Sequence, residues 1–325
     1  MSKKKTKVAV VGVGSLGQHH ARVYSEMENV ELVAVVDKDE KRAVEIAAKF
    51  ECAVYTDLKP LYGTIDAASI VVPTSAHHAV SKPLLKEGIH LLLEKPITST
   101  LQEANDLIST SKASGALLQV GHIEQFNTGV ILLKKHLNNP RFIECHRVSP
   151  FVGRGTDVHV ILDLMIHDID IILSLVPSAL KEIRASGTAV LTTMIDIANV
   201  RLAFENGCVA NITASRISLT KLRKIRIFEH DAYYSLDYAQ QKMAVFRRVF
   251  EDDGSPKITS EHFSTNKEEP LKGELASFIS SIQTGDLPKV SGEDGQRALD
   301  VALQIVDLIK KSTEDPLMKE VPIKS

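Results

Sequence analysis

Gly12-Val13-Gly14-Ser15-Leu16-Gly17 follows directly on the apolar run Val8-Ala9-Val10-Val11, and Asp37 comes twenty residues after Gly17. This order predicts a strand, a tight turn and the start of a helix, with an acidic residue where the next strand ends. Gly12 allows a sharp turn, Gly14 allows the backbone to approach a pyrophosphate, and Gly17 allows the helix to pack closely on the strand. The stretch therefore predicts a dinucleotide-binding turn in an α/β domain.

The acidic residue after the second expected strand bears on the choice of cofactor. Asp37 is placed to accept hydrogen bonds from the adenosine ribose, and its charge would repel an added 2′-phosphate. The sequence therefore predicts NAD rather than NADP, although the neighbouring Lys38 weakens that preference. The phosphates are expected at the start of the helix, where main-chain N–H groups are unpaired. The cofactor contacts expected here are Gly12, Gly14, Ser15, Leu16, Gly17, Asp37 and Lys38.

The composition is that of an ordinary globular protein. The chain has 325 residues, 44% of them hydrophobic, and a formal net charge of −2. This length predicts two domains, and the near-neutral charge argues against a nucleic-acid partner. No apolar run is long enough to cross a bilayer, and the N-terminus lacks a signal-peptide pattern, so no membrane contact is expected. The three cysteines are widely spaced, which favours a reducing, cytoplasmic environment without disulfides.

Strands and helices alternate over the first part of the chain. The expected strands are residues 7–11, 31–36, 68–72, 90–93 and 117–120, and the expected helices between them are 16–27, 41–50, 76–86 and 102–113. Short apolar strands separated by helices predict a doubly wound parallel sheet, whose ligands bind at the carboxyl ends of the strands. We expect this Rossmann-type domain to span residues 1–122.

The pattern changes in the remainder, residues 123–325. Helices are expected at 124–136, 161–175, 271–284 and 292–310, and strands at 142–148, 224–228, 232–238 and 243–249. Apolar residues alternate at period two on both sides of Asn206-Gly207, which is a strong hairpin signal. Exposed loops are expected at 252–257 and 265–270. The second domain is therefore predicted to contain an antiparallel sheet with one face covered by helices.

Two of the expected strands in the first domain run into polar residues. One leads into Pro73-Thr74-Ser75-Ala76-His77, and the next ends in Glu94-Lys95-Pro96. A charged pair at the tip of a buried strand is unfavourable unless it is paired or faces a ligand. Beside a nicotinamide, Lys95 would place a positive charge on an alcohol or ketone oxygen. The alternative is a helix-capping Glu94 followed by a solvated Lys95.

The helix expected at 161–175 carries a polar stripe on an otherwise apolar surface. Asp163, His167 and Asp170 fall within an arc of roughly 60° in an α-helix, whereas Asp168 points elsewhere. A helix that is apolar almost all round is buried, so the stripe must face a ligand or an internal partner. His167 suits proton transfer at neutral pH, with Asp163 holding its tautomer. The alternative is a core histidine paired with an internal acid.

Several other polar residues have a weaker pattern. The histidines His77, His78, His122, His159 and His167 do not match the spacing of a metal site, so no catalytic metal is expected. His19 and His20 on the first helix are interpreted as surface or packing residues. Arg154, in a glycine-flanked loop, is expected either to bind a phosphate or carboxylate of the substrate or to remain solvated.

Together these motifs resemble the Gfo/Idh/MocA family of oxidoreductases, over nearly the whole chain. The resemblance rests on the glycine turn with Asp37, on Pro73-Thr74-x-x-His77, on Glu94-Lys95-Pro96, on Asp163-x-x-x-His167-x-x-Asp170 and on Val290-Ser291-Gly292-Glu293-Asp294-Gly295. It implies a Rossmann domain followed by an α+β domain with an open, mostly antiparallel sheet. It also implies homodimers or homotetramers that assemble through that sheet.

The resemblance implies a chemistry and residue roles as well. Family members transfer a hydride between a nicotinamide and a secondary alcohol of a sugar or polyol. Lys95 matches the family's catalytic lysine, His167 its proton-transfer histidine and Asp163 the partner of that histidine. The resemblance completes the expected cofactor contacts with Pro73, Thr74, His77, Glu94, Lys95 and His122. The substrate contacts that it implies are Lys95, Glu124, Arg154, Asp163 and His167.

Two segments resemble one branch of the family in particular. Residues 121–127 and 162–168 match a branch that oxidises the 3-hydroxyl of UDP-N-acetylglucosamine, in the synthesis of envelope glycolipids such as lipopolysaccharide. Gln125 and Thr128 depart from that branch, where arginine and proline are usual. The sequence therefore predicts an NAD-dependent nucleotide-sugar dehydrogenase. A dehydrogenase of a free polyol or sugar, of the inositol or glucose type, is the first alternative, and a non-catalytic NAD-binding regulatory protein is the second.

Overall fold

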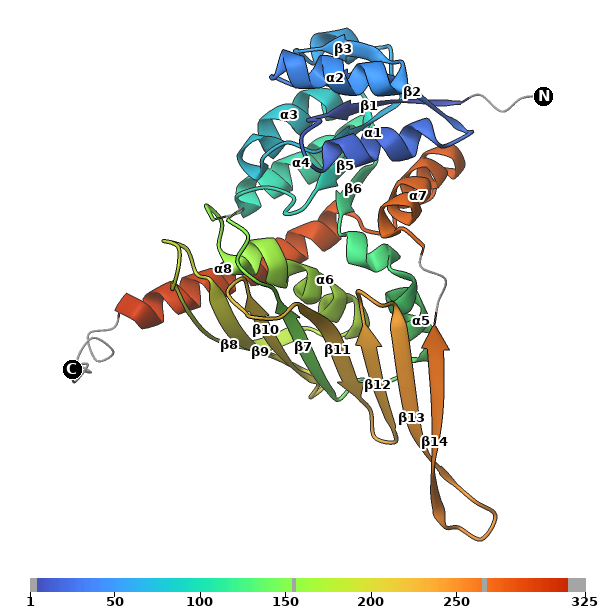
Figure 1. The fold of residues 1–325 in the computed structure, drawn as a ribbon, viewed down its shortest axis with the longest axis vertical. Helices are drawn as coiled ribbons and strands as arrows, with labels where there is room; N and C mark the ends of the chain where they lie inside the picture. Colours follow the sequence, from blue (N-terminus) through green and yellow to red (C-terminus); the bar gives the residue numbers. More distant parts are fainter. Residues whose placement is uncertain (1–4, 154–155, 265–267, 315–325) are drawn as a thin grey trace. The chain divides into compact units, whose positions relative to one another are not determined.

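A computed structural model describes residues 5–153, 156–264 and 268–314 (Figure 1). The chain forms two compact units. The first runs to Phe126 and takes up Glu269–Leu299, and the second consists of Asn127–Glu268 and the chain from Asp300 on. The single boundary expected after residue 122 therefore differs from this division, because a later segment of the chain packs within the first unit.

The first unit contains a six-stranded sheet in which every neighbouring pair is parallel. Its strands are β1 (Thr6–Val11), β2 (Val30–Val36), β3 (Ala53–Tyr55), β4 (Ala67–Ile70), β5 (His90–Glu94) and β6 (Leu118–Gly121). The order β3-β2-β1-β4-β5-β6 is that of the Rossmann fold, as the sequence predicts. The strand order reverses between β1 and β4, which is where such sheets bind their ligands.

Helices connect these strands and cover the sheet (Figure 1). They are α1 (Gly17–Ser25), α2 (Glu40–Phe50), α3 (Thr74–Lys86) and α4 (Leu101–Ser114), with short 3-10 turns η1 (Lys59–Leu61) and η2 (Ile123–Phe126). The helix α7 (Pro270–Thr284) joins them from much later in the chain. Its residues Leu275 and Phe278 lie fully buried in one core cluster with Val10 and Tyr24. The last helix, α8 (Gly292–Glu314), contributes to both units.

The second unit is built on an eight-stranded sheet. Its strands are β7 (Phe142–Val148), β8 (Leu180–Thr188), β9 (Ile197–Phe204), β10 (Val209–Ser215), β11 (Leu222–Phe228), β12 (Ala232–Asp237), β13 (Lys242–Phe250) and β14 (Pro256–Ser264). The order is β14-β13-β12-β11-β7-β10-β9-β8, and only the β7–β10 pair is parallel. The predicted mostly antiparallel sheet is confirmed. Gly207 forms the β9–β10 turn with a φ of +83°.

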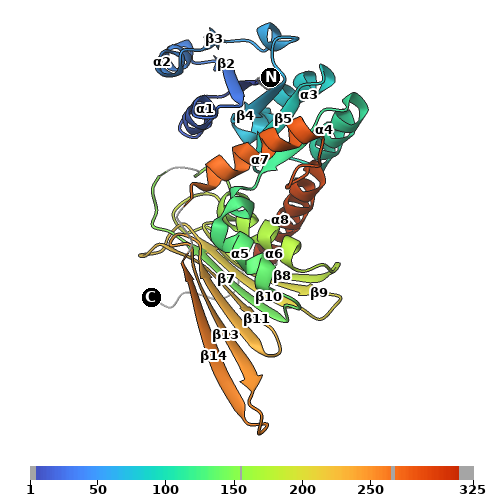
Figure 2. The same cartoon turned by 90° about the vertical axis from the view of Figure 1, so that its right-hand side faces the viewer.

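One face of the eight-stranded sheet carries α5 (Thr128–His136) and α6 (Ile166–Leu175) (Figure 2). The helix expected at 124–136 is interrupted, because the side chain of Asn127 accepts the N–H of Gly129 and caps a new helix there. The helix expected at 161–175 begins as a π-helical turn, η3 (Ile161–Met165), before α6. In the described ranges, no helix combines the length and apolar character required to cross a membrane.

Candidate active site

The glycine-rich turn leads from β1 into α1. Gly12 adopts a φ of +86°, and a Cβ there would lie 2.4 Å from the carbonyl oxygen of Val71. At Gly17, a Cβ would lie 1.8 Å from the carbonyl oxygen of Gly12, whereas at Gly14 it would meet no atom within 4 Å. Close packing of the backbone therefore requires two of these glycines, and the third leaves open space beside the turn.

A cavity of about 620 Å³ opens at this turn. Its walls come from the ends of β1, β2 and β4 and the start of α3, so it lies where the strand order reverses. Its volume is in the range of small-molecule sites. The expected cofactor residues among its lining are Gly12, Gly14, Asp37, Lys38 and Pro73. Ser15 and Leu16 are exposed on the turn, and no side chain among the described residues caps the start of α1.

Asp37 fixes the shape of the turn. Its Oδ2 accepts the N–H of Val13 at 2.8 Å, and its Oδ1 accepts the N–H of Asp39 at 3.0 Å. A carboxylate has further lone pairs, so these bonds leave acceptor capacity for a ribose. Arg42, which the sequence analysis missed, donates its Nε–H to the carbonyl oxygen of Val13 at 3.0 Å and pairs with Glu45 at 2.8 Å. The feature of the sequence that could have pointed to Arg42 is its position in the first turn of α2.

The loop after β5 is held by buried groups. The N–H of Lys95 donates to Oε2 of Glu94 at 3.2 Å, and the Lys95–Pro96 peptide bond is cis. His77 is 1% exposed, with Nδ1 2.9 Å from the carbonyl oxygen of Pro96 and Nε2 2.9 Å from that of Val72. Burial lowers the pKa of His77. His77 therefore joins the end of β4 to the Lys95 loop; a direct contact with a cofactor stays a prediction.

The chain after β6 lies in a buried environment. His122 is 1% exposed and Glu124 is 7% exposed. The Nζ of Lys289 donates to the carbonyl oxygen of Gln125 at 2.7 Å and lies 4.6 Å from the centre of the Phe126 ring. This lysine precedes the late Val290–Gly295 motif and was not anticipated from the sequence. It fixes the segment that carries two of the expected site residues.

The polar stripe of the second unit starts on a π-helical turn. Asp163 lies in η3, whereas His167 and Asp170 lie in α6. The angle expected for a uniform α-helix therefore does not apply to Asp163, because a π-helix closes its hydrogen bonds one residue further along. Such turns occur frequently at functional sites. Asp163 and His167 are half-buried, and Asp170 is 4% exposed.

The neighbour of His167 takes part in a buried ion pair. Asp168 is 1% exposed and accepts two hydrogen bonds from Arg147, Nε to Oδ2 and Nη2 to Oδ1, both at 2.9 Å. Arg147 projects from β7, and its guanidinium carbon lies 5.1 Å from the centre of the Tyr238 ring. This bidentate pair holds α6 against the sheet. The sequence analysis treated Asp168 as a polar exception and did not anticipate its partner.

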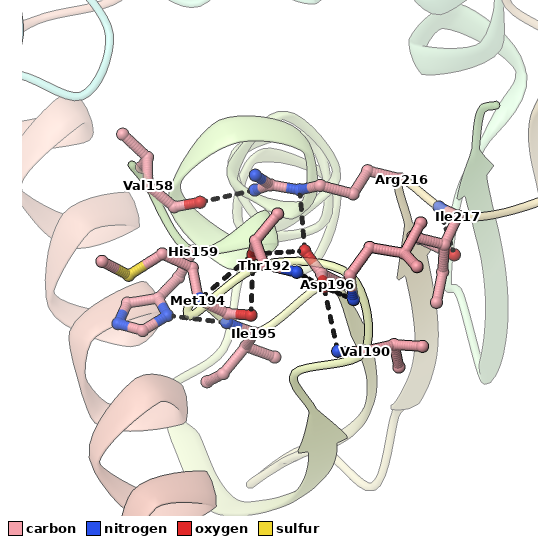
Figure 3. A network of polar contacts seen from close by, with 11 residues as sticks. Val158, His159, Val190, Thr192, Met194, Ile195, Asp196, Arg216 and Ile217 are labelled. Carbon is pink, nitrogen blue, oxygen red and sulfur yellow. Dashed lines mark hydrogen bonds and ion pairs between the residues drawn. The ribbon is translucent and has the colours of Figure 1, made fainter. Parts of the chain in front are cut away.

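A second network holds the chain just before η3 (Figure 3). Asp196, fully buried, accepts the N–H groups of three successive residues, Val190, Leu191 and Thr192, at 2.8–2.9 Å. Arg216 lies 3.9 Å from the Asp196 carboxylate and donates to the carbonyl oxygen of Val158 at 2.6 Å. Nδ1 of His159 accepts the N–H of Ile195 at 3.1 Å. The carbonyl oxygen of His159 in turn accepts the N–H of Asp163 at 3.1 Å.

The expected residues thus form two groups. The glycine turn, Asp37, Pro73, Thr74, His77, Glu94, Lys95, His122 and Glu124 belong to the first unit, and Asp163 and His167 belong to the second. Arg154 lies outside the described residues. Within residues 5–153, 156–264 and 268–314, no group of three or more His, Cys, Asp or Glu side chains could hold a metal ion.

A doubly wound sheet with an open cavity at its glycine turn is the architecture of a dinucleotide-binding domain. Residues 6–122 match the NAD-binding Rossmann fold of the GFO/IDH/MocA oxidoreductase family, and residues 136–233 match a C-terminal domain of the same family. The chain therefore belongs to the Gfo/Idh/MocA family of oxidoreductases.

Named relatives agree with this assignment. A UDP-N-acetylglucosamine 3-dehydrogenase from Acidithiobacillus ferrooxidans is 35% identical over 92% of this chain and 96% of its own length. A crystal structure of the enzyme of that name from the same organism superposes with a TM-score of 0.89, 33% identity and coverage of 94% of this chain and 98% of that chain. A myo-inositol 2-dehydrogenase from Thermotoga maritima is 25% identical over 90% of this chain and 93% of its own length.

Proposed function

We propose that this protein is an NAD-dependent dehydrogenase that oxidises the 3-hydroxyl of UDP-N-acetylglucosamine to a ketone. The observation that carries the proposal is the 35% identity to a UDP-N-acetylglucosamine 3-dehydrogenase over 92% of this chain and 96% of the relative. The inositol dehydrogenase is more distant, at 25% identity over a similar length. The nucleotide sugar is therefore favoured over a free polyol.

The residues around the cavity fit NAD. Gly14 leaves room for a pyrophosphate next to the uncapped start of α1, and Asp37 supplies an acceptor for the ribose hydroxyls. Arg42 is engaged by Val13, Gln18 and Glu45, which makes it a poor partner for a 2′-phosphate. This arrangement supports NAD as the preferred cofactor. Bound NAD would supply the acceptor for the hydride that leaves the sugar carbon.

Residues from both units have roles in the proposed oxidation of the sugar. In our proposal the imidazole of His167 takes the proton of the 3-hydroxyl, and Asp163 orients that imidazole. The ammonium of Lys95 stabilises the negative charge that develops on the same oxygen. The alcohol thus loses one proton to the protein and two electrons with one hydrogen to the cofactor, and a ketone results.

A substrate panel tests this proposal. UDP-N-acetylglucosamine, UDP-glucose, myo-inositol and glucose are offered with NAD and, separately, with NADP, and nicotinamide reduction is followed by absorbance. We expect the highest kcat/KM with UDP-N-acetylglucosamine and NAD. Preference for myo-inositol would favour the polyol alternative. Tight NADH binding without turnover of any sugar would favour the regulatory alternative.

The cellular compartment and the biosynthetic role are part of the same proposal. Cys52, Cys145 and Cys208 are free thiols, which supports a reducing, cytoplasmic environment. The product is a 3-keto sugar, whose carbonyl is the substrate type of an aminotransferase. The branch that residues 121–127 and 162–168 resemble acts in lipopolysaccharide synthesis, and we propose the same role for this protein.

We propose further that the protein self-associates through the eight-stranded sheet. Phe142, Phe228, Tyr233 and Phe246 form a row across four neighbouring strands, with ring centres 4.9–5.8 Å apart, and they alternate with the buried residues of those strands. A half-buried aromatic row suits a two-fold contact with a second copy. Light scattering of Phe228→Lys should show a monomer, with the exposed Lys181→Glu as the control. An unchanged mass for Phe228→Lys would count against this interface.

A further inference from the structure

His20 occupies an unusual place for a polar side chain. It lies in α1, three residues after Gly17, and its side chain is fully buried, whereas the adjacent His19 is exposed. From the sequence both were interpreted as surface or packing residues, and the structure places His19 at the surface and His20 in the interior. Among the described residues, neither ring nitrogen of His20 has a hydrogen-bond partner. A buried imidazole of this kind reduces stability relative to an apolar side chain, so its environment calls for a physical explanation.

The carboxylate of Glu94, at the end of β5, lies close to the ring. Nε2 of His20 lies 3.4 Å from Oε1 of Glu94, a distance longer than that of a normal hydrogen bond. Burial raises the pKa of Glu94, but His20 and then Lys95 more than offset this and hold the pKa below its usual value. Glu94 is therefore a buried anion at neutral pH, and His20 is one of the groups that keep it so.

The carboxylate of Glu94 has little freedom to move. Gly121 lies directly opposite it in the β5–β6 pair, and a Cβ at Gly121 would come within 2.9 Å of Oε1 and 3.1 Å of Oε2. The Oε2 atom accepts the N–H of Lys95 at 3.2 Å. His20 on one side and Gly121 on another thus leave a narrow slot, and the orientation of the carboxylate in that slot sets the main chain at Lys95.

A second buried histidine acts on the same loop from another helix. His77 in α3 lies 2.9 Å from the carbonyl oxygen of Pro96, the residue after Lys95. The N–H of Lys95 is therefore held by the Glu94 carboxylate, and the carbonyl oxygen of the next residue, Pro96, is held by His77. Both contacts come from inside the domain and act on the main chain of this loop.

We propose that His20 is a positioning residue for Lys95, which it orients through the carboxylate of Glu94. The catalytic part of this inference rests on the proposed function, in which the Lys95 ammonium stabilises charge on the reacting oxygen. The structural part does not, because it concerns the mobility of the loop in the ligand-free protein. A displacement on the order of 1 Å in a catalytic group can lower a rate about 100-fold, so the contact has a measurable consequence.

Two substitutions at His20 separate an electrostatic role from a packing role. His20→Phe fills the same space without a polar atom, whereas His20→Gln places an amide nitrogen where Nε2 lies. We expect His20→Phe to lower kcat by about 10- to 100-fold, with the KM for NAD and for the sugar changed less than about twofold, because Lys95 acts in the transition state. His20→Gln should recover most of kcat. His19→Gln is the matched control and should behave as the unmodified protein.

Hydrogen exchange of the ligand-free protein provides the second readout. We expect the amide of Lys95 to exchange faster in His20→Phe than in the unmodified protein, and at the normal rate in His20→Gln and His19→Gln. Gly121→Ala places a methyl group against the carboxylate of Glu94 and should also speed hydrogen exchange of the Lys95 amide. If His20→Phe does not fold, His20→Gln and Gly121→Ala give the comparison.

The outcomes are distinguishable from those of the proposed function. Normal exchange at Lys95 in both His20→Phe and Gly121→Ala would overturn the positioning role, whatever the substrate is. Equal loss of kcat in His20→Phe and His20→Gln would also overturn it, since the amide would then fail to replace the imidazole. Faster exchange with no turnover of any sugar would support the positioning role and contradict the proposed function.

Discussion

The glycine turn after β1 and the helix that carries His167 differ in what holds them in place. In the turn, the backbone packs on itself because Gly12 and Gly17 have no side chain, and Asp37 accepts two main-chain N–H groups. Around His167, ionised side chains hold the structure in place, because Arg147 pairs with Asp168 in the interior. The glycine turn is thus shaped by backbone, whereas the helix that carries His167 is held by buried charge.

The largest expected effect concerns the two groups that we assign to chemistry, one in each region. Lys95→Ala and His167→Asn should each lower kcat by about 10²- to 10³-fold, because each removes a group that acts on the reacting hydroxyl. NADH binding, measured by fluorescence, should stay within about twofold in His167→Asn. Lys49→Ala and His19→Asn, at exposed positions, are the controls. Near-normal turnover in both catalytic variants would remove the proposed mechanism and leave the fold untouched.

The next effect tests whether buried charge holds the His167 helix. Asp168→Asn leaves the Arg147 guanidinium buried without its counter-charge and should lower the free energy of unfolding by about 3–5 kcal/mol. The double variant Arg147→Met/Asp168→Leu should recover much of that loss, since both charges are then gone. Urea denaturation measures both. The exposed Glu182–Arg184 pair is the matched control, and its removal should change stability by less than about 1 kcal/mol. Equal losses at the two pairs would contradict this account.

Two glycine substitutions test the backbone-shaped region. Gly17→Ala places a Cβ against the carbonyl oxygen of Gly12, so we expect a loss of about 1–3 kcal/mol in unfolding free energy. Gly14→Ala meets no protein atom and should leave stability within about 0.5 kcal/mol, yet weaken NAD binding because the methyl group enters the cavity. Thermal unfolding and NADH titration separate these results. A stability loss in Gly14→Ala as large as that in Gly17→Ala would refute the interpretation.

The smallest effect concerns Asp196, whose carboxylate anchors the loop between β8 and β9. Burial raises its pKa, but the N–H groups of Val190, Thr192 and Leu191 and the Thr192 hydroxyl more than offset this and lower the pKa to about 2. A lowered pKa means that the stabilisation is present above the ordinary carboxyl pKa of about 4 and is lost as the pH falls toward 2. Asp196→Asn should therefore cost about 1.5 kcal/mol at pH 7, and this difference should shrink below pH 4.

The measurement for Asp196 is urea denaturation of both proteins between pH 7 and pH 2.5, with the exposed Asp252→Asn as the control. A difference that stays constant over this range would show that the carboxylate charge does not contribute.

The elements that could be predicted from the sequence are those determined by residues close together in the chain. The turn at residues 12–17 was predicted correctly because Gly12 and Gly17 meet steric demands from within a few residues or from one neighbouring strand. The three strands that were not expected, β3, β8 and β14, all lie at the edge of a sheet. Edge strands have a partner on one side only and keep much of their surface in water, so the alternation that marks a strand is weak. In β14, for example, most side chains are exposed.

The partners of the site residues were beyond the reach of the sequence for a different reason. Arg147 and Asp168 are 21 positions apart, and His20 and Glu94 are 74 apart, so only the fold brings them together. Nor did the spacing of Asp163 and His167 reveal that η3 winds as a π-helix. These features depend on which side chains meet in the core, and no periodicity in a single sequence encodes that.

The π-helical turn at Ile161–Met165 would allow a single-residue deletion to change the residues that precede His167. Such a turn accommodates one residue more than an α-helical turn, so loss of a single residue would let the segment rewind as an α-helix with its main-chain bonding intact. Deletion of Leu164 would place Asp163 three positions before His167 and put Leu162 at the fourth. A one-residue deletion would thereby put an isobutyl group, in place of the carboxylate, at the fourth position before the imidazole.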